Sequence, residues 1–586
     1  MKVEKPVGTS DGPRAARSPE GVPDSRGLNL FDADPSFRGL LGLHLDPKLC
    51  GHLLPHFGRL GEMAGAELDE LALVADKNPP LLNGQKVEKS PAYKRLEEVA
   101  FGEYGLAAMS HRGGVLGWPE PLPPVAKYSL SYLYVQAEFG VCCPLSMTDA
   151  LTRTIRKFAD PALVARYLPG LTSQDMDALT QGAMFMTEQQ AGSDVGLVKT
   201  LAKKEKDHWT LHGEKWFCSN VDAGLALVLA RPQDAPQGTS GLSLFLLPRT
   251  LPDGSPNRYR ILRLKEKLGT RDMPSGEIKL EGALAWLVGD PQQGFKQMAD
   301  MINMSRLSNG MRAAGMMRRA LTEALFVARN REAFGKKLIE LPLMRRQLLK
   351  LMLPAEAARS VLFFISKDLE KADAGDDAAR KRVRLMTPLV KFRACRDARR
   401  VTGDAMEIRG GVGYTEEWSD PRLVRDAHLG SIWEGTSNIV ALDVLRAIRR
   451  EHCLEALLPE LNERIERISP SIPRLLAGRL AASLDKAAEF AHEVASTQSE
   501  AYARQAATGL YYACAAALLA DEGTRLGQRG DARRQLLAFL AYVHRLAPRD
   551  PLRHVTTGFE AGMADALLPE TPLAPEAAER ILTRLA

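Results

Sequence analysis

One carboxylate in the segment SIWEGTSNIV, residues 431–440, is a candidate general base. Glu434 stands between the bulky pair Ile432–Trp433 and the small, turn-like run of residues 435–437. Apolar neighbours remove water from a carboxylate, and a positioned, partly dehydrated carboxylate can take a proton near neutral pH. The alternative is a surface acid beside a buried tryptophan, and the rest of the chain has to distinguish the two.

Two stretches in the middle of the chain could bind a planar aromatic ring. The segment MFMTEQQAGSDVG, residues 184–196, offers uncharged donors and acceptors from Thr187, Ser193 and a glycine-containing loop. The segment GEKWFCSN, residues 213–220, places two aromatic side chains near the Ser219 hydroxyl. An aromatic could cover one face of a ring while the hydroxyl meets a ring nitrogen. A strand-to-loop transition and plain strand packing are the alternatives.

Two later stretches could bind a phosphate-bearing ligand. In RNREAFG, residues 329–335, Arg331 can pair two N–H groups with a phosphate, and Phe334 could pack on a ribityl chain or ring. The alternative is the basic end of a helix with Gly335 as its C-cap. In EIRGGVGYTEE, residues 407–417, three glycines in four positions would let the backbone approach a ligand closely. A helix stop followed by a turn explains them equally.

Several common sites have no support in the sequence. No GxGxxG follows a strand-like segment and no GxxxxGK[ST] occurs, which argues against a Rossmann dinucleotide site and a P-loop. The motifs HExxH and GxSxG and any Cys/His cluster are also missing. A metal centre and an α/β-hydrolase nucleophile are therefore unsupported.

The composition is typical of a globular chain with several domains. The 586 residues exceed one simple core, and 45% are hydrophobic and 26% charged. No run of eighteen uncharged apolar residues occurs, which argues against a membrane span. Seven scattered cysteines without a CxxC motif fit a reducing compartment, so we expect a cytoplasmic protein. The net charge of +6 is compatible with phosphate-bearing ligands.

Changes in periodicity divide the chain into five parts. Residues 1–37 are rich in Gly, Pro, Ser and charge, and we expect them to form a mobile tail. Apolar residues at helical spacing predict an N-terminal helical domain over residues 38–181. Short segments bounded by turn residues predict five or more strands, in a small sheet or barrel, over residues 182–290. Helical periodicity returns over residues 291–450 and over an Ala/Leu-rich extension, residues 451–586.

Taken together, MTEQQAGSD, KWFCSN, RxxFG, GGVGY and SIWEGTSN, in this order and at these spacings, resemble the acyl-CoA dehydrogenase family of flavoproteins. The match covers roughly residues 40–450. Within the family, the segment LPRTLPDGSPNRYRILRLKEKLG and the C-terminal extension look most like the adaptive-response AidB subgroup. The resemblance implies a mainly α fold with a central β-barrel, in the order helical domain, barrel, four-helix bundle and extra helical domain.

The resemblance also implies a cofactor. FAD would lie between barrel and bundle, and a neighbouring subunit of a homotetramer or dimer would complete its site. The residues that match cofactor contacts of the family are Met186, Thr187, Ser193, Phe217, Ser219, Arg331, Phe334, Glu407, Gly410, Gly411, Thr436 and Asn438. Among them, Glu407 and Asn438 stand where the family commonly has glutamine.

The reaction implied by the resemblance begins at Glu434, which matches the family's catalytic base. The base removes a proton from Cα of an acyl-CoA, and a hydride passes from Cβ to flavin N5. Ser193, Arg306 and Gly435 match residues at the substrate. Some relatives carry the base just before the residue that matches Arg306, but here that residue is Ser305, which cannot serve. An electron-transfer flavoprotein or another acceptor would reoxidise the flavin, in a role in fatty acid metabolism.

A series of methionines marks the long helical segment that begins near residue 292. They could line an adaptable acyl pocket, or they could pack a core. The residues concerned are Met298, Met301, Met304, Met311, Met316 and Met317.

Binding of double-stranded DNA is the second functional hypothesis, because AidB-like proteins are associated with protection from alkylation. Residues 380–400 carry nine Lys/Arg and one acid, and Arg393, Arg396 and Arg400 lie near one helical face. A solvated basic face or salt bridges between subunits are the alternatives. Residues 451–586 hold 15 basic and 18 acidic residues, a net charge of −3, which weakens the hypothesis. A third hypothesis is a flavin scaffold with a pocket too narrow for CoA esters.

Overall fold

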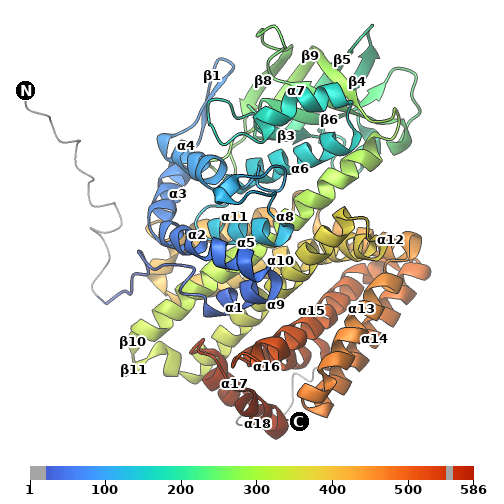
Figure 1. Cartoon of the computed structure of the whole chain (residues 1–586). Coiled ribbons are helices and arrows are strands. Elements are labelled where there is room, and N and C mark those ends of the chain that lie inside the picture. The colour runs from blue at the N-terminus through green and yellow to red at the C-terminus, as the bar shows by residue number, and fades with distance from the viewer. Residues whose placement is uncertain (1–20, 549–558, 586) are drawn as a thin grey trace, which may run out of the picture.

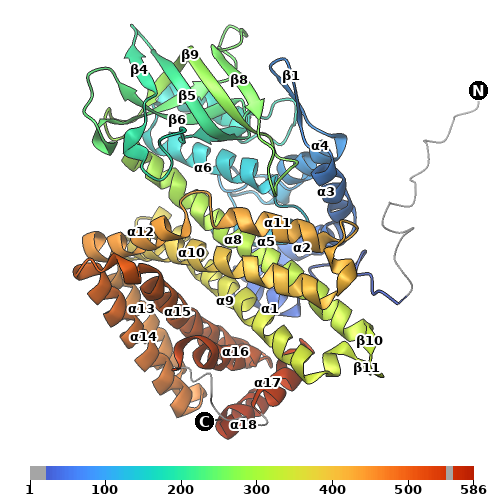
Figure 2. The ribbon, with the colours of Figure 1, turned by 180° about the vertical axis from the view of Figure 1, so that it is seen from behind.

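Three long helices cross the middle of the molecule and connect a β-barrel at one end to a helical extension at the other (Figure 1). The computed structural model describes residues 21–548 and 559–585. The long helices are α8 (Gly294–Asn330), α9 (Pro342–Asp373) and α10 (Asp377–Ile408), and they pack against one another. The view from behind shows α12 (Ser437–Glu451) between these helices and the extension (Figure 2).

The N-terminal region is mainly helical, as expected. Its helices are α1 (Pro35–His44), α2 (Pro47–Gly65), α3 (Glu67–Lys77), α4 (Pro91–Glu97), α5 (Pro124–Tyr134), α6 (Cys142–Phe158) and α7 (Pro161–Leu171). Of the tail expected over residues 1–37, residues 1–20 lie outside the described part. Phe31 is buried and stacks on Phe57 of α2, with ring centroids 5.5 Å apart, so the packed chain begins before α1.

A short hairpin interrupts the N-terminal helices, and the helical periodicity did not predict it. Strands β1 (Leu81–Asn83) and β2 (Lys86–Glu88) pair antiparallel around a turn at Gly84 and Gln85. Gly84 has a φ of 61°, which glycine adopts without strain. Glycine at the first position of a two-residue loop is a local hairpin signal, and here it outweighs the surrounding helical pattern.

Seven strands form the barrel, within the range predicted. They are β3 (Gly182–Phe185), β4 (Leu201–Lys204), β5 (Trp209–Ser219), β6 (Leu225–Pro232), β7 (Ser243–Pro248), β8 (Tyr259–Leu264) and β9 (Ser275–Val288). Strand β6 pairs with both β4 and β7, and this closes a ring through β5 and β9. The interior holds its own apolar core, which includes Phe185, Val228 and Phe245.

Helix α8 starts in direct contact with the barrel. A Cβ atom at Gly294, its first residue, would lie 2.3 Å from the carbonyl carbon of Ser243 in β7. Only glycine allows this approach, so the end of the barrel fixes the position of the helix. All six methionines of the predicted series are buried, which supports core packing as their main role.

The C-terminal extension packs against α9 through buried ion pairs. It consists of α13 (Leu454–Ile468), α14 (Arg474–Ser496), α15 (Ala503–Gly527), α16 (Arg533–Ala541), α17 (Phe559–Leu567) and α18 (Pro575–Leu585). Arg534 of α16 pairs with Glu356 of α9 and, at 2.9 Å, with Glu522 of α15. All three side chains are buried, so the extension is a firmly attached part of the fold.

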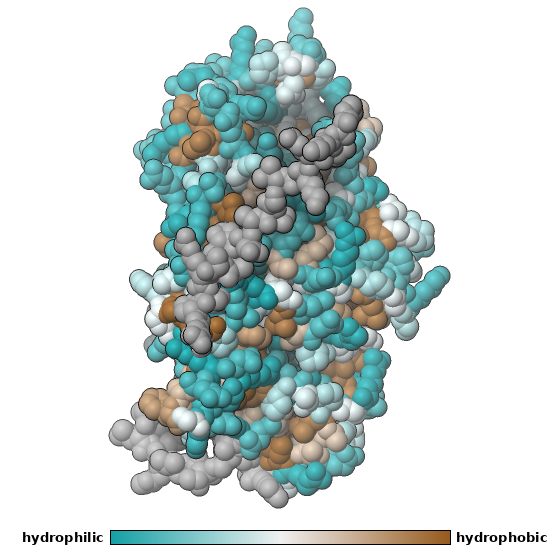
Figure 3. Space-filling model, turned by 90° about the vertical axis from the view of Figure 1, so that its left-hand side faces the viewer, coloured by the Kyte–Doolittle hydropathy of each residue, from teal (hydrophilic) through white to brown (hydrophobic). Residues whose placement is uncertain are grey.

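The face of the molecule in Figure 3 is mostly hydrophilic, with separate apolar patches. Within the described part of the chain, no helix is both long and apolar enough to cross a membrane. The seven cysteines are all free thiols.

Candidate functional site

Glu434 lies in a tight turn between α11 (Ser419–Gly430) and α12. Its φ of 47° falls in the left-handed region, which costs a non-glycine residue about 1 kcal/mol. Gly435 follows with a φ of 100°, and a Cβ there would lie 3.3 Å from a guanidinium nitrogen of Arg306. The turn therefore holds a strained carboxylate residue next to a required glycine.

Two side chains of α8 hold the Glu434 carboxylate. Ser305 Oγ donates to Oε1 at 2.8 Å, and Asn309 Nδ2 donates to Oε2. Because Ser305 and Asn309 are four residues apart, they lie on one face of the helix. The side chain is half-buried, so it is oriented by the protein and still reachable.

The backbone of the turn is held as well. Arg306 Nε donates to the Glu434 carbonyl at 3.0 Å, while Arg306 Nη1 pairs with Asp443 of α12 at 2.6 Å. Lys391 of α10 donates to the Gly435 carbonyl, and burial lowers the pKa of Lys391 to about 8. Arg306, predicted at the substrate, thus already binds protein atoms.

The apolar neighbours of Glu434 differ in their contacts. The Trp433 indole stacks on Phe139 with ring centroids 5.8 Å apart, and Arg312 lies 4.7 Å from the indole centroid. Ile432 is 59% exposed. Ile432 therefore faces solvent, and dehydration of the carboxylate by Trp433 stays a prediction.

The barrel residues predicted to meet a planar ring lie at and near the C-terminal end of β5. The Trp216 N–H donates to the Thr187 carbonyl at 2.8 Å, which joins the 184–196 segment to this strand. Lys215 Nζ lies 3.4 Å from the carbonyl of Met186. Phe217 is 54% exposed on the outside of the barrel.

Ser219 and Ser193 complete the set of predicted barrel residues. The Ser219 hydroxyl is 3.5 Å from that of Ser275, and Ser193 is exposed in the loop after β3. The thiol of Cys143, at the start of α6, lies near both the Ser219 hydroxyl and the Glu434 carboxylate. Burial raises the pKa of Cys143 to about 11, so this thiol stays protonated. The charge of Glu434 therefore reaches a thiol that neighbours the end of β5.

A second group of predicted residues lies far from Glu434 in the same chain. Helix α8 ends at Asn330, and Phe334 and Gly335 form the tip of the hairpin β10 (Glu332–Ala333) and β11 (Lys336–Lys337). The suggestion that Gly335 caps the helix is therefore wrong. From Ser305 to Arg331 the helical rise is about 39 Å.

The hairpin meets the glycine-rich loop. Arg331 Nη1 donates to the Arg409 carbonyl at 2.7 Å, next to the exposed residues Gly410 and Gly411. Glu407 is exposed nearby at the end of α10. Phe334 is 94% exposed and has a φ of 53°, an unusual position for a large apolar side chain.

The remaining predicted residues lie on α12 and α10. Thr436 and Asn438 are exposed at the start of α12. On α10, Arg393 pairs with Asp397 at 2.7 Å, and Tyr512 of α15 donates to the same carboxylate at 2.5 Å. Arg393 is thus linked to the extension through Asp397.

The other two residues of the proposed basic stripe are more accessible. Arg396 lies 3.4 Å from the Ser437 hydroxyl and is half-buried, and Arg400 is exposed. The three arginines therefore do not form one free basic stripe.

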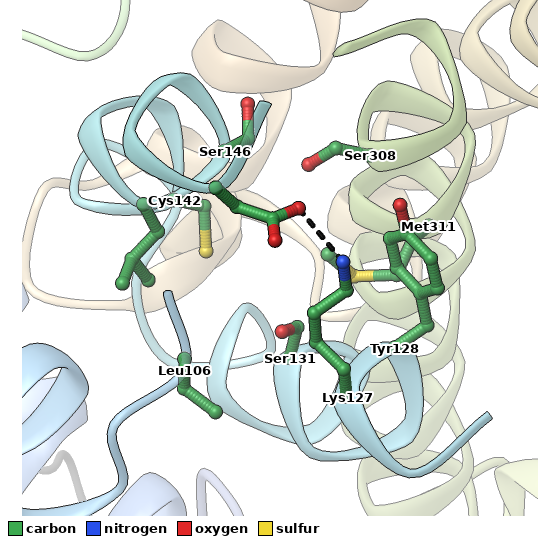
Figure 4. Close-up of a pocket in the computed structure, with 10 residues that line it drawn as sticks. Leu106, Lys127, Tyr128, Ser131, Cys142, Ser146, Ser308 and Met311 are labelled. Atoms are coloured by element: carbon green, nitrogen blue, oxygen red, sulfur yellow. Dashed lines mark hydrogen bonds and ion pairs between the residues drawn. The ribbon is translucent and has the colours of Figure 1, made fainter. Parts of the chain in front are cut away.

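Two cavities that share the lining residues Lys127 and Asp149 lie beside α8. An inner cavity of about 20 Å³, between α5, α6 and α8, has room for about one water molecule. Figure 4 shows Lys127 reaching across it to its ion pair with Asp149, at 2.7 Å. An outer cleft of about 760 Å³ shares these two residues and includes Met304 in its lining. Ser308 and Met304 line these spaces, next to the residues that hold Glu434.

Glu434 stood out in the sequence, but the α8 side chains that bind its carboxylate did not. Asn309 and Arg312 are polar positions in a helix of Met, Ala and Leu, spaced four and seven residues from Ser305. That spacing is the signal in the sequence, because it places them on the face of Ser305.

Several known proteins are similar to this chain in both sequence and architecture. The putative acyl-CoA dehydrogenase AidB of Escherichia coli is 36% identical, and the match spans 68% of this chain and 75% of that protein. The chain belongs to the acyl-CoA dehydrogenase family. Acyl-CoA dehydrogenase family member 11 of Caenorhabditis elegans is 31% identical over 75% of this chain and 73% of its own length.

Family models and a solved structure agree with this membership. The acyl-CoA dehydrogenase middle domain matches residues 183–283 and the C-terminal domain residues 292–449. The N-terminal domain of adaptive response protein AidB matches residues 21–178, as the resemblance to this subgroup predicted. The crystal structure of Caenorhabditis elegans ACDH-11 in complex with C11-CoA superimposes with a TM-score of 0.80 at 26% identity, covering 91% of this chain and 94% of that one. The predicted fold class is thereby confirmed.

Proposed function

We propose that this acyl-CoA dehydrogenase family member removes two hydrogens from an acyl-CoA thioester, with Glu434 as the base and FAD as the cofactor. The observation that carries the proposal is the fixed carboxylate. Glu434 is held by Ser305 and Asn309 and lies near Cys143, which also neighbours Ser219 on the barrel edge. A carboxylate positioned in this way can abstract the weakly acidic Cα proton.

The turn also offers a donor for the thioester. Among the described residues, the backbone N–H of Glu434 has no hydrogen-bond partner. An N–H group fixed beside the base can stabilise the negative charge that develops on a thioester oxygen when Cα loses its proton. Asn309 Oδ1 is also buried without a partner, so rotation of this amide would let it accept from Glu434 once the carboxylate is protonated.

The residues at the barrel edge fit FAD. Phe217 presents an exposed aromatic ring, and Ser219 presents a hydroxyl. Met186 and Thr187 lie on the adjoining segment after β3. Together these groups suit a flat heteroaromatic ring. When bound, the flavin supplies the acceptor for the hydride from Cβ.

The pyrophosphate and adenosine contacts require a second subunit. The residues proposed for these contacts lie about 39 Å along α8 from Ser305, too far to reach a flavin that contacts the same chain's Ser219. They are Arg331, Phe334, Glu407, Gly410 and Gly411. The exposed Phe334 on its hairpin is suited to contact a neighbouring copy. A dimer or tetramer would therefore complete each FAD site.

A CoA ester is the proposed substrate, which agrees with the C11-CoA bound to ACDH-11. Purified protein should be yellow, and its flavin absorbance should bleach anaerobically with at least one member of an acyl-CoA series from short to long chains. An electron-transfer flavoprotein or a comparable acceptor would then restore the colour. Absence of bleaching with every chain length would refute the dehydrogenase proposal.

A further inference from the structure

Arg312 is a buried cation whose two terminal nitrogens have no hydrogen-bond partner among the described residues. It lies on α8 seven residues after Ser305 and three after Asn309, on the face that holds Glu434. Its side chain is fully buried, and its Nε makes a single bond of 3.3 Å to the Ser308 carbonyl.

Two further unpartnered polar atoms lie beside it. The guanidinium is 4.7 Å from the centroid of Trp433 and 5.3 Å from that of Phe139. Trp433 Nε1 is buried and has no hydrogen-bond partner in the described part of the chain, and the same holds for Asn309 Oδ1. Trp433 is the chain neighbour of Glu434, which places Arg312 close to the turn that carries the carboxylate. Three donor atoms and one acceptor atom are thus unused next to the base.

Two other buried arginines follow on α8, Arg318 and Arg319, and both are ion-paired; Arg318 pairs with Glu570 at 2.7 Å. Arg319 pairs with Glu323 at 2.8 Å and with Asp69 at 3.3 Å. A buried cation without an anion is costly, because the lost hydration is not replaced. Unused buried donors therefore indicate that an acceptor arrives with a ligand.

We infer that the acyl pocket takes a short acyl thioester whose acyl group carries a second carboxylate, bound by Arg312. The inference rests on the proposed function. A carboxylate supplies the two acceptor oxygens that a guanidinium binds side by side, and Trp433 Nε1 can add a third bond. A methyl or methylene group at this point would leave all three donors unused.

The position of Arg312 limits the length of this acyl group. Asn309 and Arg312 differ by about 4.5 Å of helical rise, and side chains on a helix lean towards its N-terminus. The guanidinium is therefore near the level of the Glu434 carboxylate, which suits an acyl group of four or five carbons. Solvent does not reach Arg312, so the ligand must displace the half-buried Trp433 indole that packs on it.

The inference can be tested by binding, without turnover. We would load the Glu434→Gln variant with FAD and measure affinities by calorimetry for two matched pairs: glutaryl-CoA against pentanoyl-CoA, and succinyl-CoA against butyryl-CoA. We expect at least a tenfold tighter affinity for the carboxylated member of one pair, and loss of that preference when Arg312→Met is added. Equal affinities within both pairs, or a preference that survives Arg312→Met, would overturn the inference.

Thermal unfolding supplies a second readout. If Arg312 awaits a ligand anion, Arg312→Met removes an unpaired buried charge and should keep or raise Tm, whereas the matched variant Arg319→Met breaks two ion pairs and should lower it. A loss in Arg312→Met as large as that in Arg319→Met would assign Arg312 to packing and overturn the inference. Arg312→Lys, which keeps the charge, should retain part of the preference. If butyryl-CoA or pentanoyl-CoA bleaches the native flavin while the affinities are equal, only this inference fails.

Discussion

Ser305 Oγ donates to Glu434 Oε1 at 2.8 Å and joins the first third of α8 to the turn before α12. Some relatives carry the base at this position. Here Ser305 instead binds the proposed base, Glu434, which comes from the turn before α12. Together with Asn309, it fixes both carboxylate oxygens. The two helices that meet at Glu434 must therefore keep their relative position for the proposed chemistry to proceed.

Removing the amide that holds the base should slow proton abstraction. We expect Asn309→Leu to reduce the rate of flavin reduction about 100-fold, because a small misplacement of a reacting group has an effect of that size. Ser305→Ala should have a smaller effect, since the amide bond to the carboxylate remains. Stopped-flow absorbance at several pH values would measure both. FAD content serves as the control, and a rate for Asn309→Leu within twofold of wild type would show that the amide does not position the base.

The sequence was enough to propose Glu434 as the base, but it did not indicate which residues surround Glu434. Glu434 stands in a short motif whose order along the chain is distinctive. Its partner Asn309 is 125 residues away, and nothing local to either residue specifies their contact. The same reason explains why the internal role of Arg393 was missed: its basic neighbours suggested a free stripe, whereas Tyr512 of the extension binds its partner Asp397.

The buried acid Asp426 should make stability depend on pH. Burial raises the pKa of Asp426 to about 7, although its Oδ1 accepts a bond of 2.7 Å from the Thr270 N–H. Between pH 4 and 7 the unfolded chain loses this proton while the folded chain keeps it, so this group makes stability fall as pH rises through that window. We expect Asp426→Asn to gain on the order of 2 kcal/mol at pH 8 and little at pH 4.

Denaturant unfolding at the two pH values would check this. The asparagine retains an oxygen for the Thr270 N–H, so packing is conserved. A variant that is destabilised equally at both pH values would show that the charge of Asp426 is compensated in the native protein.

The exposed hairpin should control assembly and FAD retention together. Phe334→Ser removes an aromatic side chain that is 94% exposed, so the isolated chain should fold normally. We expect a shift towards smaller species in light scattering and a loss of bound FAD on gel filtration. Leu81→Ser, 66% exposed on the β1 hairpin, is the matched control and should change neither. Unchanged mass and FAD content in Phe334→Ser would contradict the shared cofactor site.

Neutralising Arg393 should affect folding more than nucleic-acid binding. We expect Arg393→Gln to lower stability by roughly 1–3 kcal/mol, because Asp397 loses its cation and stays buried. Arg400→Gln, at an exposed position, should leave stability within about 0.5 kcal/mol. Fluorescence anisotropy with double-stranded DNA over a salt series would measure nucleic-acid binding. A fall in DNA affinity for Arg393→Gln without a change in stability would reverse this assignment.

The barrel was more predictable than the buried ion pairs of the bundle. Strands such as those of residues 209–219 and 275–288 could be recognised locally, because they carry apolar and aromatic residues and are bounded by turn residues. Arg534 and Glu356 carry no such signal, since a charged residue on a helix usually faces water. Burial of such pairs depends on the packing of α9 against α16, which only the folded chain reveals.

Anaerobic flavin reduction in wild type and in Glu434→Gln tests the central claim most directly. Both proteins are reconstituted with FAD, mixed with the acyl-CoA that bleaches wild type best, and followed by flavin absorbance. We expect rapid bleaching in wild type. In the variant we expect the bleaching rate to fall by at least about 1,000-fold while FAD stays bound. A Glu434→Gln protein that bleaches at the wild-type rate would show that another group removes the proton.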